Sequence, residues 1–514
     1  MAGQSVLLML PAIGRDLEIS QENLTWILNS YVLSYGCLLL LSGRIADIIS
    51  RKYTFILGMF LFCVFSLGCG LVRNSQSVPF FILRALAGLG ASLGAPSAIG
   101  IIAENHPEGR RRSIMYAAYG AGNPIGAAVG VLLGGSLADS GSHGWRTAFY
   151  ITCGVAIIPV IGAFWAVPSH RPEPGADRRI DFLGALLSTA GLVMLLYVFT
   201  SGPTASQGFR TPEIIAMLVV SVCLLAIFIC WEWYIENRLK RPPLLKLALF
   251  TRGKGKLSVV YGFIFFNFAS FSGYFLLTDL YYQQVLHLKP SQTMLRFLPT
   301  SVSGLACNIL IAFLVPHVTG QILLCVGAVM TAIAPLLYAV IKPGAIFWTN
   351  EFWAMILCVA GADFGVAVGL IFVSKLSLSS EHSSAGGLFQ TALQVGNAFG
   401  TAIATLVYTS IAQQKVEQSS STVETVVSHG EYPPDALLPG LKSGFWTSCG
   451  LALGAFLLSA IFLGGMGTVE KKIVAIKSDP EVAHSLPMDD KYGGLENPES
   501  FGQDKTSRLV AHVR

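Results

Sequence analysis

The dominant pattern along the chain is a series of long apolar runs separated by short polar or charged segments. A helix needs roughly 20 apolar residues to cross a bilayer core of about 30 Å. Runs of sufficient length lie near residues 25–45, 53–72, 78–103, 113–138, 145–167, 182–201, 213–234, 258–284, 292–315, 320–341, 351–374, 383–411 and 443–466. They predict thirteen complete membrane-spanning helices.

The amino-terminal residues 1–13 (MAGQSVLLMLPAI) are apolar but too short to cross a bilayer. They lack the charged region and cleavage site of a signal peptide. We interpret them as a truncated first span, which brings the expected count to fourteen. We therefore expect the functional transcript to encode further residues upstream of Met1.

Composition agrees with a membrane protein. Hydrophobic residues make up 53% of the chain and charged residues 12%, about half the charged share of a soluble domain. The net charge of +5 is spread over short loops, which argues against nucleic-acid binding. The ten cysteines lie in apolar stretches without a CxxC pair, and the nine histidines show no ligand spacing. We therefore expect no disulfide framework, metal site or cofactor.

Loop charges predict the orientation. Arg and Lys gather in alternate loops, and the positive-inside rule then places both termini in the cytoplasm. The sequon that begins at Asn23 falls in the first outward loop and is a candidate glycosylation site. Residues 413–442 are expected to form a long outward loop. The polar tail, residues 467–514, is expected to be disordered and cytoplasmic.

The charged stretch 43–52 reads GRIADIISRK and separates two apolar runs. A glycine permits a sharp exit from a helix, and a carboxylate can cap or pair with a neighbouring helix end. The stretch resembles the loop between spans two and three of the major facilitator superfamily, G-x-L-A-D-R-x-G-R-K, with Ile48 and Ser50 as departures. The resemblance implies a gating loop with four key residues. These are Gly43, Asp47, Arg51 and Lys52.

A second motif lies in the run 113–138, where small residues recur every four positions around a proline. Its members are Gly120, Gly122, Pro124, Gly126, Gly130 and Gly134. Generic close packing of membrane helices explains such spacing equally well. The stretch also resembles the antiporter motif of the superfamily's exporters, G-x-x-x-G-P-x-x-G-G, with Asn123 in place of a glycine. That resemblance implies export.

Further segments extend the resemblance over most of the chain. Residues 81–90 resemble the exporters' R-x-x-q-G segment, and Trp145 and Arg146 resemble the start of span six. With the extra spans near 182–201 and 213–234, the chain resembles the fourteen-span drug:proton antiporters, particularly fungal ones. The resemblance implies an all-α integral membrane fold of two pseudo-symmetric six-helix bundles plus two extra central helices. The bundles would be residues 14–167, completed by the truncated span 1–13, and residues 258–466, with the linker spans in 182–234.

Charges deep in a span are costly and persist with a partner, a cavity or a function. Arg84 is the residue that the resemblance assigns to proton coupling. Asp363 is the only carboxylate deep in any predicted span, so it is the candidate proton carrier. A structural ion pair or a capped helix break explains Asp363 equally well. Asp279 and Glu351 lie near span ends, where solvation is expected.

Polar and aromatic side chains in the spans are candidates for the substrate cavity. They are Asn29, Tyr31, Tyr35, Asn267, Phe268, Phe271, Asn308, Gln390, Gln394 and Asn397. The last three follow i, i+4, i+7 spacing and share one helix face. Hydrogen bonding between helices is the alternative interpretation.

Together these features predict a monomeric, proton-coupled exporter of drugs, toxins or secondary metabolites that works by alternating access in the plasma membrane. Its expected partners are a small organic substrate, protons and the lipid bilayer. Three alternatives stay open. The first is a plasma-membrane or vacuolar carrier for a metabolite such as an amino acid or iron chelate. The others are a transport-inactive sensor and a membrane enzyme, the last disfavoured because no catalytic cluster is apparent.

Overall fold

The computed structural model describes residues 2–19, 24, 26–73, 76–107, 109–138, 142–168, 179–205, 207–342, 346–418 and 433–465. The candidate glycosylation site Asn23 and the tail 467–514 lie outside the described residues.

Every regular element in this part of the chain is a helix, as a bilayer requires of a chain that must satisfy its own backbone hydrogen bonds. The long helices are α1 (Ala2–Asp16), α2 (Trp26–Ile48), α3 (Arg51–Leu71), α4 (Ser77–Asn105), α5 (Arg110–Ala138), α6 (Ser142–Ala166), α7 (Phe182–Ser201), α8 (Pro212–Tyr234), α10 (Lys256–Leu280), α11 (Pro290–Leu314), α12 (Gly320–Ala339), α13 (Glu351–Leu376), α14 (His382–Gln418) and α16 (Pro434–Phe462). Short elements are η2 (Gly202–Thr204), η3 (Gly208–Arg210), η4 (Ile235–Leu239), α9 (Ala248–Thr251), η5 (Tyr281–Val285) and η6 (Ser379–Glu381).

Twelve of the described helices are long and apolar enough to cross a membrane. The glycine-rich α5 has sufficient length, with 29 residues, but is not among the twelve. Helix α1 has only 15 residues. The expected fourteen spans therefore remain a prediction where α1 and α5 are concerned.

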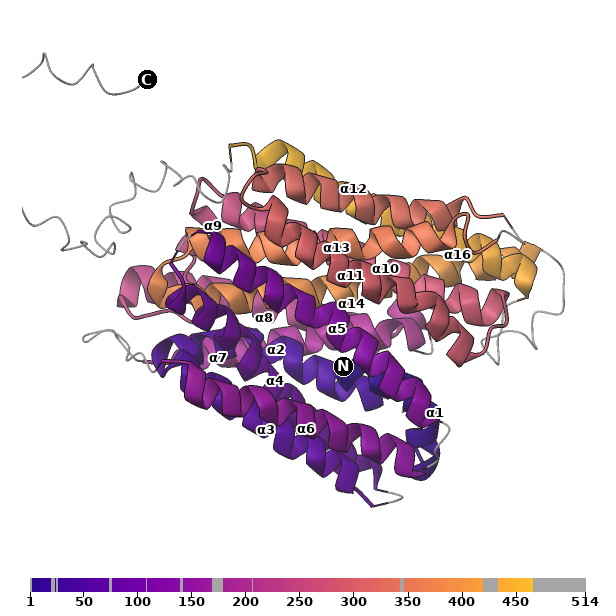
Figure 1. Ribbon diagram of the computed structural model, residues 1–514, viewed down its shortest axis with the longest axis horizontal. Coiled ribbons are helices and arrows are strands. Elements are labelled where there is room, and N and C mark those ends of the chain that lie inside the picture. The colour runs from indigo at the N-terminus through magenta and orange to yellow at the C-terminus, as the bar shows by residue number, and fades with distance from the viewer. Residues whose placement is uncertain are drawn as a thin grey trace, which may run out of the picture. The chain divides into compact units, whose positions relative to one another are not determined.

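The helices pack in two groups that lie side by side (Figure 1). In the N-terminal group, α1–α6, helix α4 packs on α2 and α3, and α1 packs on α5. In the C-terminal group, α10–α16, helix α10 packs on α14 and α16, and α12 packs on α13 and α16. The groups meet along two seams, one between α2 and α14 and the other between α5 and α11.

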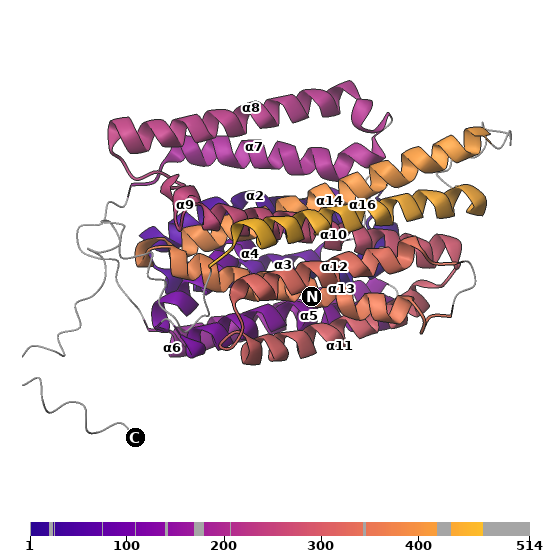
Figure 2. The same cartoon turned by 90° about the horizontal axis from the view of Figure 1, so that it is seen from above.

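Helices α7 and α8 form a separate layer on one side of the groups (Figure 2). Helix α7 contacts both α2 and α14, whereas α8 packs on α7. The side chain of Leu196 on α7 packs with Leu33 of α2 and Ala398 of α14. The extra helix pair therefore covers the seam between α2 and α14.

Glycines let the helices approach until backbone meets backbone. A Cβ atom at Gly400 of α14 would overlap the carbonyl oxygen of Ala269 on α10. A Cβ atom at Gly88 of α4 would stand 2.5 Å from the carbonyl oxygen of Tyr31 on α2. Close backbone contact of this kind replaces the hydrophobic effect as the source of attraction between helices in lipid.

The structure corrects three sequence-based expectations. The stretch 43–52 is mostly helical, because α2 continues to Ile48 and α3 begins at Arg51, which leaves a two-residue connection. The outward segment 413–442 is largely helical at both ends, since α14 continues to Gln418 and α16 begins at Pro434. Glu351 is not solvated: it is 1% exposed and its Oε2 lies 2.7 Å from Arg296 Nη1.

We predict that Gly400→Ala destabilises the protein by separating α14 from α10. Overpacking of this kind costs about 1–3 kcal/mol, and the apparent melting temperature in detergent should fall. Gly450→Ala on α16 is the matched control, because no atom lies within 4 Å of its Cβ position. Equal melting temperatures for the two variants would contradict this account of the packing.

Candidate functional site

One end of the helix bundle joins the two groups through an acidic side chain. We call it the inner end, because the predicted orientation places it at the cytoplasm. Asp47 of α2 accepts hydrogen bonds from the backbone N–H groups of Ser383 and Ser384, at 3.1 and 2.7 Å. The Ser384 hydroxyl donates to the same carboxylate at 2.8 Å. Asp47 thus caps the first turn of α14, where free N–H groups and the helix dipole favour a negative charge.

Arg51 completes this contact. Its guanidinium lies 2.9 Å from Asp47 Oδ1, and its Nε donates to the Ser383 hydroxyl at 3.1 Å. The side chains of Asp47 and Arg51 are 1% and 8% exposed. We call Asp47, Arg51, Ser383 and Ser384 the inner latch. Because its hydrogen bonds join charged groups away from water, each stabilises the closed inner end more than a surface pair would.

Gly43 lets the latch form. A Cβ atom at this position would stand 2.6 Å from the carbonyl oxygen of Ser383 and 3.0 Å from the Cα of Ser384. Any larger residue would push α14 away from α2. Lys52 plays a different part, because its ammonium donates to the carbonyl of Phe164 at 2.9 Å within the N-terminal group.

A second ion-pair cluster lies beside the latch. Glu381 of η6 contacts Arg252 and Lys246, both at 2.6 Å. Burial by itself raises the pKa of Glu381, but the Lys246 ammonium and the Arg252 guanidinium outweigh it and hold the pKa below its ordinary value. The cluster ties the segment between η4 and α10 to the start of α14.

Midway along the bundle, tyrosines and amides from both groups meet. The rings of Tyr31 and Tyr35 on α2 stack with centroids 6.1 Å apart. The Tyr35 hydroxyl hydrogen-bonds Gln394 of α14. The Tyr119 hydroxyl of α5 accepts a hydrogen bond from Gln390 at 3.1 Å. We call these five side chains the central cluster. The cluster joins the predicted cavity residues Gln390 and Gln394 to tyrosines of the N-terminal group. Of these, Tyr119 was not predicted from the sequence.

The antiporter motif and Asp363 meet at the seam between α5 and α11. A Cβ atom at Gly304 of α11 would stand 2.6 Å from Pro124 and 3.1 Å from Asp363 Oδ2. A Cβ atom at Gly120 would stand 2.7 Å from Asn308 Oδ1. The Asn308 side chain, whose amide donates to the carbonyl of Gly304 at 2.9 Å, also interacts with Asp363. We call this contact the α5–α11 junction.

Asp363 is 5% exposed, and its Oδ2 has no hydrogen-bond partner among the described residues. No ion pair between described residues includes it. The carboxyl group therefore lies in a place where a negative charge is expensive and a proton is favoured.

The other motif residues differ in their surroundings. A Cβ atom at Gly122 would meet nothing within 4 Å. Gly126 is half-buried, and Gly130 and Gly134 are buried in the outer part of α5, which packs on α1.

Arg84 lies in the N-terminal group and is not brought to Asp363. It is 2% exposed, and its Nε donates to the carbonyl of Ile27 at 3.0 Å. Its guanidinium lies over the Tyr31 ring, 4.8 Å from the centroid, and Nη2 has no hydrogen-bond partner in the described part of the chain. Arg84 thus contacts the central cluster from one side.

The remaining predicted cavity residues are distributed around this region. Asn267 is fully buried and donates to the carbonyl of Gly361 at 3.2 Å, so it links α10 and α13. Asn397 donates to Gln394 at 3.4 Å. Phe271 packs edge-on against Phe268, with centroids 5.9 Å apart. Asn29 is half-buried on α2.

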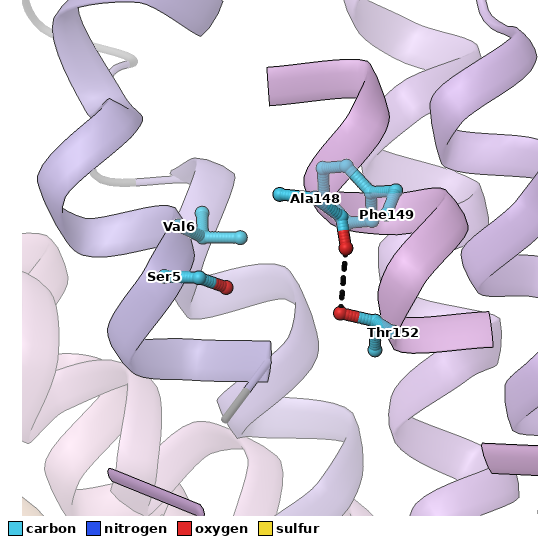
Figure 3. Close-up of a pocket in the computed structure, with 5 residues that line it drawn as sticks. All are labelled: Ser5, Val6, Ala148, Phe149 and Thr152. Atoms are coloured by element: carbon cyan, nitrogen blue, oxygen red, sulfur yellow. Dashed lines mark hydrogen bonds between the residues drawn. The ribbon is translucent and has the colours of Figure 1, made fainter. Parts of the chain in front are cut away.

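A small crevice between α1 and α6 is lined by Ser5, Val6, Ala148, Phe149 and Thr152 (Figure 3). The Thr152 hydroxyl is already bonded to the carbonyl of Ala148 at 2.8 Å. The empty volume of about 160 Å³ is smaller than the ~300–1,000 Å³ typical of ligand pockets. We interpret the crevice as a packing gap.

Sequence reasoning missed the latch partners Ser383 and Ser384, the cluster residue Tyr119 and the ion-pair centre Glu381. The segment SSEHSSAGG does carry a signal, because serines before small residues are typical of a helix start. Nothing local indicates that this helix start meets Asp47, more than 300 residues earlier.

A bundle of apolar helices, with buried charges where its two groups meet, defines a polytopic membrane transporter. The comparisons make the assignment specific. The family model described as "Major Facilitator Superfamily" matches residues 1–401. The chain therefore belongs to the major facilitator superfamily, whose members are transporters of small molecules and not enzymes.

Several curated proteins are similar over most of their length. "MFS-type transporter 1" of Pyricularia oryzae is 28% identical, over 90% of this chain and 81% of its own. "Puromycin resistance protein pur8" of Streptomyces alboniger is 29% identical, over 89% and 86%. "Low affinity ammonium transporter" of Saccharomyces cerevisiae is 27% identical, over 88% and 84%.

Solved structures share the fold. The human organic anion transporter MFSD10 superposes with a TM-score of 0.57 at 13% identity, covering 89% of both chains. The proton:xylose symporter XylE superposes with a TM-score of 0.59 at 15% identity, covering 92% of this chain and 94% of its own.

We predict that Asp47→Asn shifts the protein away from the closed inner end. Hydrogen bonds to a charged group contribute about 1.5–3 kcal/mol each, so losing the charge should reduce the closed population about tenfold or more. Spin labels at Tyr53→Cys and His317→Cys, in a background without reactive native cysteines, report the distance between the groups. Lys52→Gln is the control, since Lys52 bonds within one group. An unchanged distance distribution in Asp47→Asn would refute the latch.

We also predict that acid weakens the Glu381 cluster. Its pKa lies below the ordinary value of about 4.3. The stabilisation is therefore complete above that value and is lost as the pH falls through the lowered pKa. Glu381→Gln should lower the melting temperature at neutral pH. It should also reduce the fall in melting temperature that wild type shows as the pH is lowered. Glu104→Gln removes a more exposed partner of Arg51 and should have a smaller effect. Parallel acid limbs for Glu381→Gln and wild type would contradict the assignment.

Proposed function

We propose that this protein is a proton-coupled exporter of small organic compounds that works by alternating access. The observation that carries the proposal is Asp363: a carboxyl group midway along α13, 5% exposed, with an oxygen that has no partner among the described residues. A group in such a place accepts a proton readily and releases it when water reaches it.

The position of Asp363 supports a coupling role. The α5–α11 junction is one of the two seams along which the groups must move during alternating access. Burying an ionised carboxylate there costs several kcal/mol, whereas a neutral carboxylic acid costs much less. Protonation therefore favours a closed seam at Asp363, and proton release favours a seam open to water.

The glycine motif provides the means to transmit this change. Gly120 and Pro124 are in contact distance of Asn308 and Gly304, the same residues that surround Asp363. A shift of the Asn308 amide on proton transfer would displace α5 directly, because Gly120 has no side chain between the α5 backbone and Asn308. This supports the export assignment that the motif's resemblance implies.

The central cluster suits organic substrates. Stacked tyrosines offer flat apolar surface, and Gln390 and Gln394 offer donors and acceptors, a combination that binds amphipathic compounds better than bare ions. Relatives named for resistance to puromycin and methylenomycin A support export of toxic organic compounds. By analogy with the family, we assign the protein to the plasma membrane and expect it to be a monomer.

Uptake of a small metabolite is the second candidate. It is favoured by the relative named "Low affinity ammonium transporter", which is similar over 88% of this chain. Transport direction in sealed vesicles distinguishes the two functions: an imposed proton gradient should drive the compound opposite to the protons for export, and with them for symport.

We predict that Asp363→Asn abolishes proton-driven transport while binding of the substrate is retained. The amide keeps the size of the side chain but cannot exchange a proton. Everted vesicles with an acidic lumen, to which cationic dyes are added from outside as test substrates, measure transport, and dye fluorescence at equilibrium measures binding. Transport at the wild-type rate in this variant would exclude Asp363 as the proton carrier.

Asp279→Asn is the matched control for this experiment. Asp279 lies at the end of α10, and its carboxylate accepts a hydrogen bond from Gln283 at 2.8 Å. It should leave the pH dependence of transport intact. If Asp279→Asn and Asp363→Asn lose coupling to the same extent, the effect of the second is structural.

A further inference from the structure

The extra helix pair carries a buried carboxyl group that the transport cycle proposed above does not use. Glu232, near the inner end of α8, is 0% exposed. Neither of its side-chain oxygens has a hydrogen-bond partner in the described part of the chain. An ionised carboxylate left in this condition would be strongly destabilising, so the site requires a proton or a cation.

A second carboxyl group lies next to it. A Cβ atom at Gly184 of α7 would overlap Asp181 Oδ2 and stand 2.7 Å from Glu232 Oε1. The two acids therefore face each other across the space that Gly184 leaves empty. Two like charges this close cannot both be ionised without a large penalty.

The surroundings decide which acid keeps the charge. Asp181 is half-buried and caps α7, accepting a hydrogen bond from the Gly184 N–H at 3.0 Å. The Trp231 indole also donates to it, at 3.0 Å to Oδ2 and 3.2 Å to Oδ1. These donors and the helix dipole stabilise the ionised form of Asp181. Glu232 is left as the neutral partner.

The charged groups around the pair do not provide an alternative to a proton. The charged groups that act on Glu232 are Asp181 and Glu236, and both are acidic; the backbone amides of Leu244 and Leu245 also act on it but carry no net charge. No ion pair between described residues includes Asp181 or Glu232. Glu236 is itself occupied, since it accepts a hydrogen bond from the Leu247 N–H at 3.3 Å.

We propose that Asp181 and Glu232 form a carboxyl–carboxylate pair that binds one proton between the two extra helices, at a site separate from Asp363. Glu232 carries the proton and Asp181 the charge. Asp181 connects the pair to water at the inner end, because it is only half-buried. The proposal does not depend on the direction of transport or on proton coupling.

The pair is placed to influence the inner latch. Leu244 and Leu245 follow α8, are 2% and 4% exposed and pack in the same core cluster as Ala185 of α7. The next residue, Lys246, binds Glu381, which lies two positions before Ser383. Release of the proton would place two negative charges beside residues 244–246. A change of pH at the inner end would therefore alter the segment whose Lys246 binds Glu381 at the start of α14.

Infrared spectroscopy of the full-length protein in lipid nanodiscs tests the proposal. In the Asp363→Asn background, the acid-minus-alkaline difference spectrum should contain a carbonyl band from a protonated buried carboxyl group. Glu232→Gln should remove that band. Asp181→Asn should keep the band but lower the pH at which it disappears, because no negative charge then opposes ionisation of Glu232. Asp181→Asn is the safer variant for folding, since asparagine is an equally good helix cap. Glu213→Gln, at the opposite end of α8, should leave the band in place.

A stability measurement gives an independent readout. Wild type should lose melting temperature as the pH rises above neutral, because deprotonation brings two like charges together, and Glu232→Gln should lose this slope. A band that persists in Glu232→Gln, a band that disappears at the same pH in Asp181→Asn and wild type, or parallel pH profiles of melting temperature for Glu232→Gln and wild type would overturn the proposal. A rise in melting temperature with Na⁺, K⁺ or Mg²⁺ that Glu232→Gln abolishes, without the carbonyl band, would also overturn it and assign a cation to the site.

Discussion

The contact on which the architecture depends is one carboxylate placed at the start of a helix from the other half of the protein. Asp47 satisfies two backbone donors of α14 that would otherwise be unpaired in a region with little water. This contact is strong because it is buried. It is reversible because water can hydrogen-bond both to the carboxylate and to the two N–H groups once the helices separate. A transporter needs both properties, since each closed end must be stable and must also open in every cycle.

The two seams divide the physical tasks of such a cycle. At the seam between α2 and α14, charge-assisted hydrogen bonds join the two groups at the inner end. At the seam between α5 and α11, a lone carboxyl group lies among small residues, so its charge changes the cost of contact. In the proposed cycle, protonation of Asp363 and capping of α14 therefore act at different places on the interface between the two groups. In the proposed cycle, coupling follows from rigid packing within each group and does not require direct contact between Asp363 and the latch.

The sequence predicted the helices well, because runs of some twenty apolar residues have few other structures available in a bilayer. The motif residues Gly43, Asp47 and Arg51 were also identified from the sequence, and the structure places them against the start of α14; their gating role stays a prediction. Their partners were not, because hydrophobic periodicity does not encode which helix ends meet. The convergence of Gly120, Pro124, Asn308 and Asp363 was hidden for the same reason: each has a local signal, and only the packing of α5, α11 and α13 brings them together. Arg84 and Asp363 were both predicted to take part in proton coupling, but they lie in different groups.

The layer formed by α7 and α8 makes the two sides of the protein unequal toward lipid. On one side, Leu196 of α7 packs with Leu33 and Ala398, so that the seam between α2 and α14 is covered by protein. On the other side, Ile125 of α5 and Ile309 of α11 are exposed. An amphipathic compound dissolved in one leaflet diffuses in two dimensions and meets the protein from the side. Of the two seams, the one between α5 and α11 is the one that α7 and α8 do not cover, and Asp363 lies beside it.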